Sequence, residues 1–213
     1  MAVNFSGAKQ ATIYRFFQTG TLPSPAIYLK NLIIMPKLVY HVAITLDNFI
    51  AHTDGSVEGF LPEGDHIPAY LEHLKSYGTV VMGRATYEFG YQFGMKPGDA
   101  PYPHMQHFIF SKSLTLPANP NGNVHVISDE PAAFVRDLKT KVDTDIYLCG
   151  GAKFAGYLFQ KKLVDRIVVK LNPVLFGKGI PLFETDEQMT NLQLVDTHVY
   201  KSGVILLTYD VMV

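Results

Sequence analysis

The sequence predicts an α/β fold with a mostly parallel central sheet, an antiparallel C-terminal hairpin and helices on both faces. Short apolar runs typical of buried strands alternate with segments of helical periodicity along most of the chain. Two of these runs, residues 79–82 and 146–149, pass through glycine directly into a helical pattern, which is the order of a parallel strand and its crossover helix. The last two strand patterns, residues 192–200 and 204–212, are separated by only three residues, which predicts a hairpin.

The composition indicates one soluble domain without a global charge field. The chain has 213 residues, enough to bury one sizeable core, and 18 basic against 19 acidic residues give a net charge of −1. We therefore expect no nucleic-acid partner and no membrane partner. No apolar run approaches the roughly 20 residues needed to cross a bilayer. The single cysteine, Cys149, excludes an intramolecular disulfide and fits a reducing, cytoplasmic location.

Residues 1–34 differ from the rest of the chain, and we treat them as an N-terminal extension of a functional domain at residues 35–213. Their only charged side chains are Lys9, Arg15 and Lys30. Met35 leads directly into the first strand pattern, so the preceding residues are interpreted as a loosely attached extension. A transit peptide and an arm that docks on a partner subunit are the alternatives.

The first half of the domain begins with a strand pattern at residues 37–45, rich in β-branched and aromatic side chains. Residues 52–64 contain two glycine turn signals and are predicted to form a surface loop of the length that often covers a site. Asp65 can cap the helix that follows, which Gly78 ends. A buried strand at residues 79–82 then leads to Gly83 and Arg84.

The second half adds strand patterns at residues 107–110, 123–127 and 165–172 to the central run at 146–149. Ser128 or Asp129 is expected to cap a helix between the strands at residues 123–127 and 146–149. With the C-terminal hairpin, the sequence predicts about eight strands and four helices.

Groups that suit an anion follow three of the predicted strands. They are Arg84 after one strand, Ser111 with Lys112 after the next, and the Gly150-Gly151 turn with Lys153 after the central strand. Ligands of open α/β sheets bind beyond the carboxyl ends of the strands, so these groups should converge. A guanidinium, an ammonium and free backbone amides together suit a dinucleotide with an additional phosphate, hence NADPH rather than NADH. The alternative is that Arg84 and Lys112 are solvated surface charges.

Other common sites are not predicted. No dinucleotide-binding G-x-G-x-x-G, P-loop or G-x-S-x-G motif is present. His104 and His107 lie in a proline-rich stretch with no carboxylate or cysteine at ligand spacing, so we predict no metal site and interpret them as surface histidines or substrate contacts. Cys149 ends an apolar strand and is interpreted as a small core residue rather than a nucleophile.

Several of these segments together resemble the dihydrofolate reductase-like family, most closely its riboflavin-biosynthesis reductase branch, the RibD C-terminal domain. The resemblance runs from about Met35 to the C-terminus. The segments that carry it are Ala43-Ile44-Thr45-Leu46-Asp47-Asn48-Phe49-Ile50-Ala51, Val81-Met82-Gly83-Arg84-Ala85-Thr86-Tyr87-Glu88, Ser111-Lys112, Leu148-Cys149-Gly150-Gly151 and Asn172-Pro173-Val174-Leu175-Phe176-Gly177-Lys178-Gly179 with Pro181-Leu182-Phe183.

The resemblance implies a dihydrofolate reductase-like fold and an NADPH-dependent reductase that transfers a hydride to a C=O or C=N bond of a small pterin, pyrimidine or related substrate. In the riboflavin branch this is 5-amino-6-(5-phosphoribosylamino)uracil reductase activity. It also implies a homodimer. The alternatives are an NADP-binding module without turnover, acting as a sensor, and a scaffold whose interface is its function.

By similarity, four groups of residues would contact NADPH. The Gly150–Gly151 peptide is typically cis in the family. Ala43 and Ile50 would lie along the nicotinamide; Gly83, Arg84, Ala85 and Thr86 would meet the pyrophosphate or 2′-phosphate; Ser111 and Lys112 would flank the adenosine; and Gly150, Gly151, Ala152, Lys153 and Phe154 would cradle the pyrophosphate.

The catalytic acid is less clearly indicated. Dihydrofolate reductases place a carboxylate on the helix before the Met-Gly-Arg strand; that region has Glu63, Asp65 and Glu72, none in clear register, and Asp65 is taken as the candidate. The riboflavin branch places one after the first strand, which corresponds to Asp47. Either side chain could instead be a turn or helix cap, with water supplying the proton. Asn48 replaces the usual glycine, and Glu58-Gly59-Phe60 replaces the aromatic residue expected near position 59. Both departures weaken the expectation of a folate or pyrimidine substrate.

Overall fold

The computed structural model describes residues 35–117, 122–185 and 189–212. The predicted extension, residues 1–34, lies outside them. The helices are α3 His66–Leu74, α4 Arg84–Phe89, α5 Pro131–Leu138 and α6 Ala152–Gln160, with a 3-10 helix at Gly90–Phe93. The strands are β1 Leu38–Ile44, β2 Phe49–Ala51, β3 Thr79–Gly83, β4 Gln106–Phe110, β5 Val124–Ile127, β6 Ile146–Gly150, β7 Arg166–Leu171, β8 Ile180–Pro181, β9 Leu192–Val199 and β10 Ile205–Val211.

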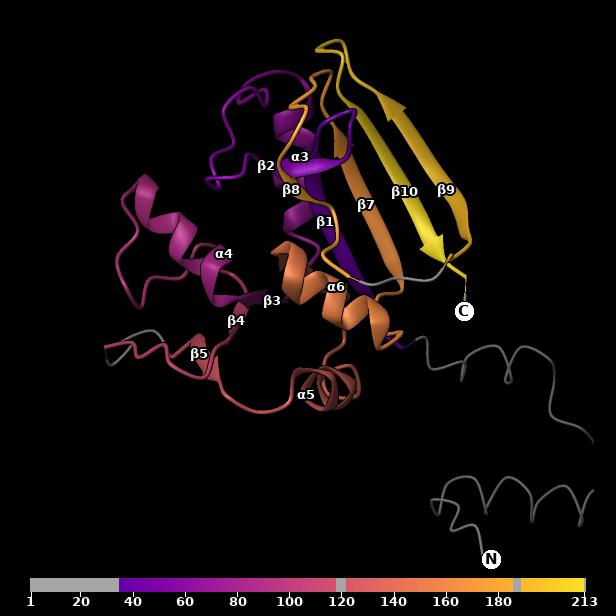
Figure 1. The fold of residues 1–213 in the computed structure, drawn as a ribbon. Coiled ribbons are helices and arrows are strands. Elements are labelled where there is room, and N and C mark those ends of the chain that lie inside the picture. The colour runs from indigo at the N-terminus through magenta and orange to yellow at the C-terminus, as the bar shows by residue number, and fades with distance from the viewer. Residues whose placement is uncertain (1–34, 118–121, 186–188, 213) are drawn as a thin grey trace, which may run out of the picture. The chain divides into compact units, whose positions relative to one another are not determined.

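Eight of the strands form one sheet in the order β5-β4-β3-β6-β1-β7-β10-β9 (Figure 1). The first six run parallel, and β10 and β9 add an antiparallel edge, as the sequence predicts. The remaining strands, β2 and β8, form a small antiparallel pair that the sequence pattern did not indicate. At three and two residues they are too short to show alternation.

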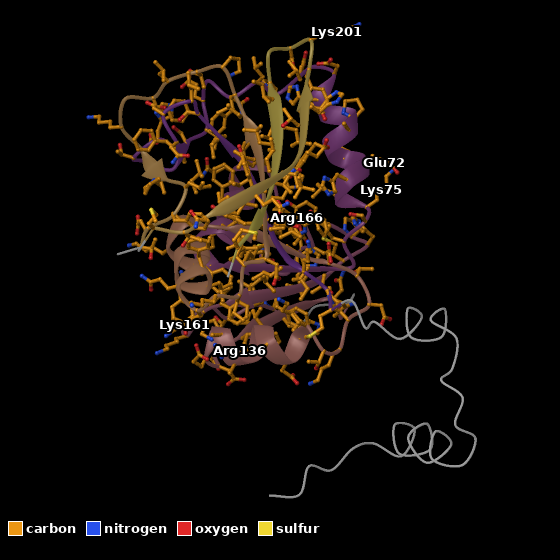
Figure 2. The ribbon with its side chains drawn as sticks, turned by 90° about the vertical axis from the view of Figure 1, so that its right-hand side faces the viewer. Glu72, Lys75, Arg136, Lys161, Arg166 and Lys201 are labelled. Carbon is orange, nitrogen blue, oxygen red and sulfur yellow. The ribbon has the colours of Figure 1, made fainter. Side chains whose placement is uncertain are left out.

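Helices cover both faces of the sheet, so each face carries its own apolar core. On one face, α5 and α6 pack on strand residues such as Leu38 and Leu148. On the other face, Leu74 of α3 and Tyr87 of α4 join strand residues such as Tyr147. On the outer surface of α3, Leu71 is exposed and Glu72 forms an exposed ion pair with Lys75 just beyond the helix end (Figure 2). The predicted two-faced helical cover is therefore confirmed.

Two predicted helix caps are wrong. Asp65 precedes α3, but its carboxylate accepts hydrogen bonds from the amides of Lys201 and Ser202 in the β9–β10 turn and none from α3. Helix α5 is capped by Glu130, whose carboxylate accepts from the two amides of Ala132 and Ala133, rather than by Ser128 or Asp129. Pro131 fixes the first turn of α5 and so moves the cap to the residue before it.

The parallel order of the central strands places three chain segments at one edge of the sheet. Strand β6 lies between β3 and β1 and runs parallel to both. Their carboxyl ends therefore bring Ile44, Gly83 and Gly150 to the same edge, although these residues are far apart in the sequence. None of the helices in the described residues is long and apolar enough to cross a membrane.

Candidate functional site

A cavity of about 920 Å³ opens at the edge where β1, β3 and β6 end. Its volume lies at the upper end of the range of small-molecule and cofactor sites, about 300–1,000 Å³. Ten of the residues predicted to bind a cofactor line it: Ala43, Ile50, Gly83, Arg84, Ala85, Thr86, Gly151, Ala152, Lys153 and Phe154. The predicted convergence of strand ends therefore occurs, whereas Gly150, Ser111 and Lys112 do not line the cavity.

The loop predicted to cover a site does so. Residues 52–64 contribute a set of mainly apolar residues to the cavity wall: Gly55, Val57, Phe60, Leu61 and Pro62. Phe60 stacks on Phe176, with ring centroids 5.2 Å apart, and Phe176 also stacks on His52 at 3.7 Å. These ring contacts tie the loop to the segment that follows β7. The loop therefore forms one side of the cavity in the structure.

The junctions β3–α4 and β6–α6 approach each other closely at the cavity. The Gly150–Gly151 peptide is cis, as the resemblance implies. A Cβ atom on Gly151 would lie 3.2 Å from the Thr86 hydroxyl, and one on Gly83 would lie 3.4 Å from Cβ of Phe154. Glycine at both positions thus leaves space that a side chain would take. Ala152 and Lys153, the first residues of α6, line the cavity here, and a helix N-terminus suits a phosphate group of a dinucleotide.

Arg84 is the cation best placed for such an anion. Its Nε lies 2.8 Å from Oε1 of Glu88, and its Nη1 donates to the hydroxyl of Ser113 at 3.0 Å. The hydroxyl of Ser111 in turn accepts from the amides of Ser113 and Leu114, so Ser111 shapes the turn that carries Ser113. These bonds hold the half-exposed guanidinium at the cavity wall.

Lys153 supplies a second cation at the start of α6. Its side chain is 87% exposed and its Nζ lies 3.6 Å from the carboxylate of Glu184. An ion pair this exposed contributes little to stability, so Lys153 remains available to an anionic ligand. Lys112 is exposed and does not line the cavity.

The two predicted catalytic carboxylates do not line the cavity. Asp47 accepts hydrogen bonds from the hydroxyl of Thr45 and from the amides of Phe176 and Gly177, and these bonds lower its pKa, that from Thr45 most. Asp65 is bound to the β9–β10 turn, and the amide of Lys201 contributes most to lowering its pKa. Each carboxylate therefore holds a turn in place, and neither is positioned to contact a substrate in the cavity.

The floor of the cavity is built from residues that the sequence did not single out as site residues. They come from β1, α3, the segment before β4, β6 and β7, and are His41, Tyr70, Tyr102, Tyr147, Cys149 and Lys170. Helix α3, where dihydrofolate reductases carry a carboxylate, presents Ile67 and Tyr70 instead. The sequence does mark one of these residues as unusual: Lys170 is the only charged residue between Ile167 and Leu171, in an otherwise apolar strand pattern.

The tyrosines and the cysteine of this floor stay uncharged at neutral pH. The hydroxyls of Tyr70 and Tyr147 lie 3.5 Å apart, and the Tyr102 hydroxyl lies 3.8 Å from the sulfur of Cys149. Burial raises the pKa of all three tyrosines and of the Cys149 thiol. Cys149 is thus a thiol rather than a reactive thiolate, although it borders the cavity as well as the core.

His41 lies in β1 beside these groups and is 2% exposed. Neither of its ring nitrogens has a hydrogen-bond partner among the described residues. Burial, with smaller contributions from His73 and Lys170, lowers the pKa of His41 to about 3, so the ring is neutral. Unpaired buried polar atoms are uncommon and costly, and His41 has two such atoms within the part of the chain that the structure describes.

The interpretation of His107 as a surface or substrate-contacting residue is wrong. His107 is fully buried; its Nε2 accepts from the amide of Tyr102, and its Nδ1 lies 3.1 Å from the carbonyl of Asn123. It therefore positions the segment that carries Tyr102. His104 is exposed and contacts the carbonyl of Leu74. Within the described residues, no cluster of three or more histidine, cysteine or acidic side chains could hold a metal ion.

Comparison with known proteins identifies the family. The model of the RibD C-terminal domain matches residues 36–206. The chain belongs to the RibD C-terminal domain family. A relative from Bacillus subtilis, the uncharacterized protein YwjB, is 30% identical over 171 residues, covering 79% of this chain and 94% of that protein.

Two solved structures show the same fold. A Shewanella sp. PV-4 protein, provisionally described as a riboflavin biosynthesis protein, is 23% identical with a TM-score of 0.71, covering 84% of this chain and all of that chain. Dihydrofolate reductase from Enterococcus faecalis, solved with NADP(H), is 18% identical with a TM-score of 0.53, covering 82% of this chain and 96% of that chain. The predicted dihydrofolate reductase-like fold is therefore confirmed, and membership of this family implies a reductase.

The bonds of Asp47 predict how an Asp47→Asn variant behaves. In this variant a side-chain NH₂ group, which is a hydrogen-bond donor, replaces one carboxylate oxygen. It would face the backbone N–H donors of Phe176 and Gly177, so we expect a lower melting temperature at pH 7. A depressed carboxyl pKa stabilises the fold above the unfolded value of about 3.9, and this contribution disappears as pH falls through the folded pKa. The difference in melting temperature should therefore shrink below about pH 4.

The control is Asp129→Asn, which removes an exposed carboxylate that makes none of these bonds in the described structure. Thermal unfolding and turnover of NADPH with a carbonyl or imine substrate are measured for both variants. Loss of turnover in Asp47→Asn with unchanged stability would contradict the structural role and favour a catalytic one.

Proposed function

We propose that the chain is an NADPH-dependent reductase that transfers a hydride to a C=O or C=N bond of a small planar molecule. The observation that carries the proposal is one continuous cavity with two chemically different ends. The β3–α4 and β6–α6 junctions offer Arg84, Lys153 and helix amides to phosphate groups. The aromatic floor offers Tyr70, Tyr102 and other uncharged groups to a ring. Family membership supports the same reaction.

The bound cofactor supplies the hydride, and the chain supplies position and environment. Ala43 and Ile50, on β1 and β2, present small or apolar surface between the two ends of the cavity, where a flat nicotinamide would lie. The residue 52–64 loop also lines the cavity, and its role in this proposal is to limit access of water. Holding the two reacting carbons together in such a space accounts for a large part of the rate enhancement of reductases.

The substrate is proposed to be a pterin, a pyrimidine or a related ring. A narrower proposal is reduction of 5-amino-6-(5-phosphoribosylamino)uracil in riboflavin biosynthesis, which the family supports. We propose that the protein works in the cytoplasm, where NADPH and a single reduced cysteine are both expected.

A second function is binding of NADP without turnover. It is favoured by one observation: within the described residues, neither predicted catalytic carboxylate reaches the cavity. In this case the protein would bind NADP in the cavity and act as a sensor of it. Steady turnover with any carbonyl or imine compound would exclude it.

Replacing Arg84 tests the cofactor site. An Arg84→Ala variant should bind NADPH about 10- to 100-fold more weakly, since a hydrogen bond to a charged group contributes about 1.5–3 kcal/mol. Fluorescence titration at fixed salt measures the affinity. The matched control is Arg136→Ala on α5, at the end of the domain opposite Lys201 and the β9–β10 turn (Figure 2). Unchanged NADPH affinity in Arg84→Ala would contradict the assignment.

The C-terminal edge of the sheet supports the proposal of a homodimer. All eight residues of β9 are exposed. Because of a bulge in its pairing with β10, Leu192, Leu194 and Val199 lie opposite Val211, Tyr209 and Ile205, so they share one face. An apolar exposed face on an edge strand suits association with a second copy of the chain.

A Leu194→Asp variant tests this face. The wild type should sediment as a dimer at micromolar concentration and the variant as a monomer, because the aspartate would be buried without a partner. Leu71→Asp on the exposed side of α3 is the control and should remain dimeric. Analytical ultracentrifugation of the three proteins gives the result; a monomeric wild type would refute the proposal.

A further inference from the structure

Lys170 is a cation at the floor of the cavity that has no anionic partner in the described part of the chain. It lies in β7, opposite Ala43 of β1, and its side chain is on the same face of the sheet. Its Nζ is 4.8 Å from the centre of the Tyr70 ring. The side chain lines both the large cavity and a second, small cavity beneath α3. A lysine in this position is half-buried and still borders the space that a ligand would fill.

The groups around Lys170 are polar but uncharged. His41, His73 and Tyr70 share the small cavity with it, and Tyr147 and Cys149 share the large one. Burial lowers the pKa values of His41 and His73, so both rings are neutral. Burial raises the pKa values of Tyr70, Tyr147 and Cys149, so these side chains stay protonated. The carboxylate that lines the large cavity, Glu184, is the ion-pair partner of Lys153 at α6. The floor therefore carries a net positive charge.

An ammonium in such surroundings favours an oxygen ligand. Burial lowers the pKa of Lys170, which shows that it has lost solvation without gaining a compensating charge. His41 adds ring nitrogens that no group of the described chain satisfies. The small cavity between them, about 10 Å³, has room for about one water molecule that could join His41 to Lys170. The unpaired ring nitrogens of His41 and the lack of an anionic partner for Lys170 both indicate that a group outside the described residues completes this floor.

We propose that Lys170 binds an oxygen atom of the substrate and so selects planar carbonyl compounds over rings that present amino groups in place of the carbonyl oxygens. The inference rests on the proposed reductase function and names its substrate class. Neither Asp47 nor Asp65 lines this cavity, and at its floor Lys170 offers an ammonium to a carbonyl or anionic oxygen. Rings with an amino group in place of that oxygen would place a donor, or a positive charge, against Lys170 and lose affinity.

The same contact assists the reaction. When the hydride and its electron pair reach the carbon, the π electrons of the substrate's double bond move to the oxygen, which becomes negatively charged. The ammonium of Lys170 lies next to this oxygen and stabilises the charge more than it stabilises the neutral carbonyl. Water then protonates the oxygen. Lys170 touches the reacting group and acts without changing its own covalent state.

The test compares two ring probes of similar size. Barbiturate presents carbonyl oxygens and is an anion at neutral pH, whereas 2,4-diaminopyrimidine presents amino groups on the same ring. Calorimetry measures binding of each probe to the full chain saturated with NADP⁺. The wild type should bind barbiturate at least 10-fold more tightly than 2,4-diaminopyrimidine, and a Lys170→Met variant should lose about 10- to 100-fold in barbiturate affinity. Lys170→Arg, which keeps the charge, should retain most of it.

Lys161 provides a matched control. Its ammonium also lies over a tyrosine, 5.6 Å from the ring centre of Tyr157, but it is exposed at the end of α6 and does not line the cavity (Figure 2). Lys161→Met should therefore bind barbiturate like the wild type. Preference of the wild type for 2,4-diaminopyrimidine, binding of neither probe, or unchanged barbiturate affinity in Lys170→Met would each overturn the proposal.

NADP⁺ affinity, measured before the probes are added, separates this proposal from the function on which it rests. Wild type and Lys170→Met should bind NADP⁺ equally, because Lys170 lies at the floor and the phosphate-suited groups lie at α4 and α6. Failure of the wild type to bind NADP⁺ would contradict the reductase itself. Normal NADP⁺ binding without the barbiturate effect would contradict only the role of Lys170.

Discussion

The parallel pairing of β6 with both β1 and β3 is the constraint on which the site depends. It brings the carboxyl ends of three distant segments to one edge of the sheet, where the glycines at residues 83, 150 and 151 let the turns approach closely. The two cores hold this arrangement from opposite faces. A cavity at this edge therefore follows from topology, and the side chains around it determine the ligand.

Those side chains divide the cavity into two electrostatic environments. At the helix starts, Arg84 and Lys153 are exposed cations that an anion can reach from solvent. At the floor, Lys170 is a half-buried cation among neutral aromatic groups. Solvent screens a charge of the first kind, whereas a charge of the second kind is screened less and acts more strongly on a group beside it. The first kind suits phosphate binding, and the second suits recognition of one substrate atom.

The sequence predicted the sheet, the hairpin and the phosphate-suited junctions, because periodicity and glycine-containing turns are local signals. It could not predict which strand residues face the cavity: Tyr147 and Cys149 looked like core, and Lys170 looked like part of a strand. It placed Asp47 and Asp65 in catalysis because a carboxylate in a turn looks the same whether it binds substrate or backbone amides. Only the fold shows that distant turns, at Phe176 and Lys201, occupy them.

The central claim is that this cavity holds a phosphorylated dinucleotide, and comparing NADPH with NADH on the wild-type protein tests it most directly. Calorimetric titration at fixed, moderate salt gives both affinities. The account predicts that NADPH binds at least 10-fold more tightly, because an additional phosphate meets a guanidinium and its charge-assisted hydrogen bonds. Equal affinity for NADPH and NADH would contradict the role of Arg84 in binding the 2′-phosphate. Binding of neither would contradict the assignment of the cavity as a cofactor site.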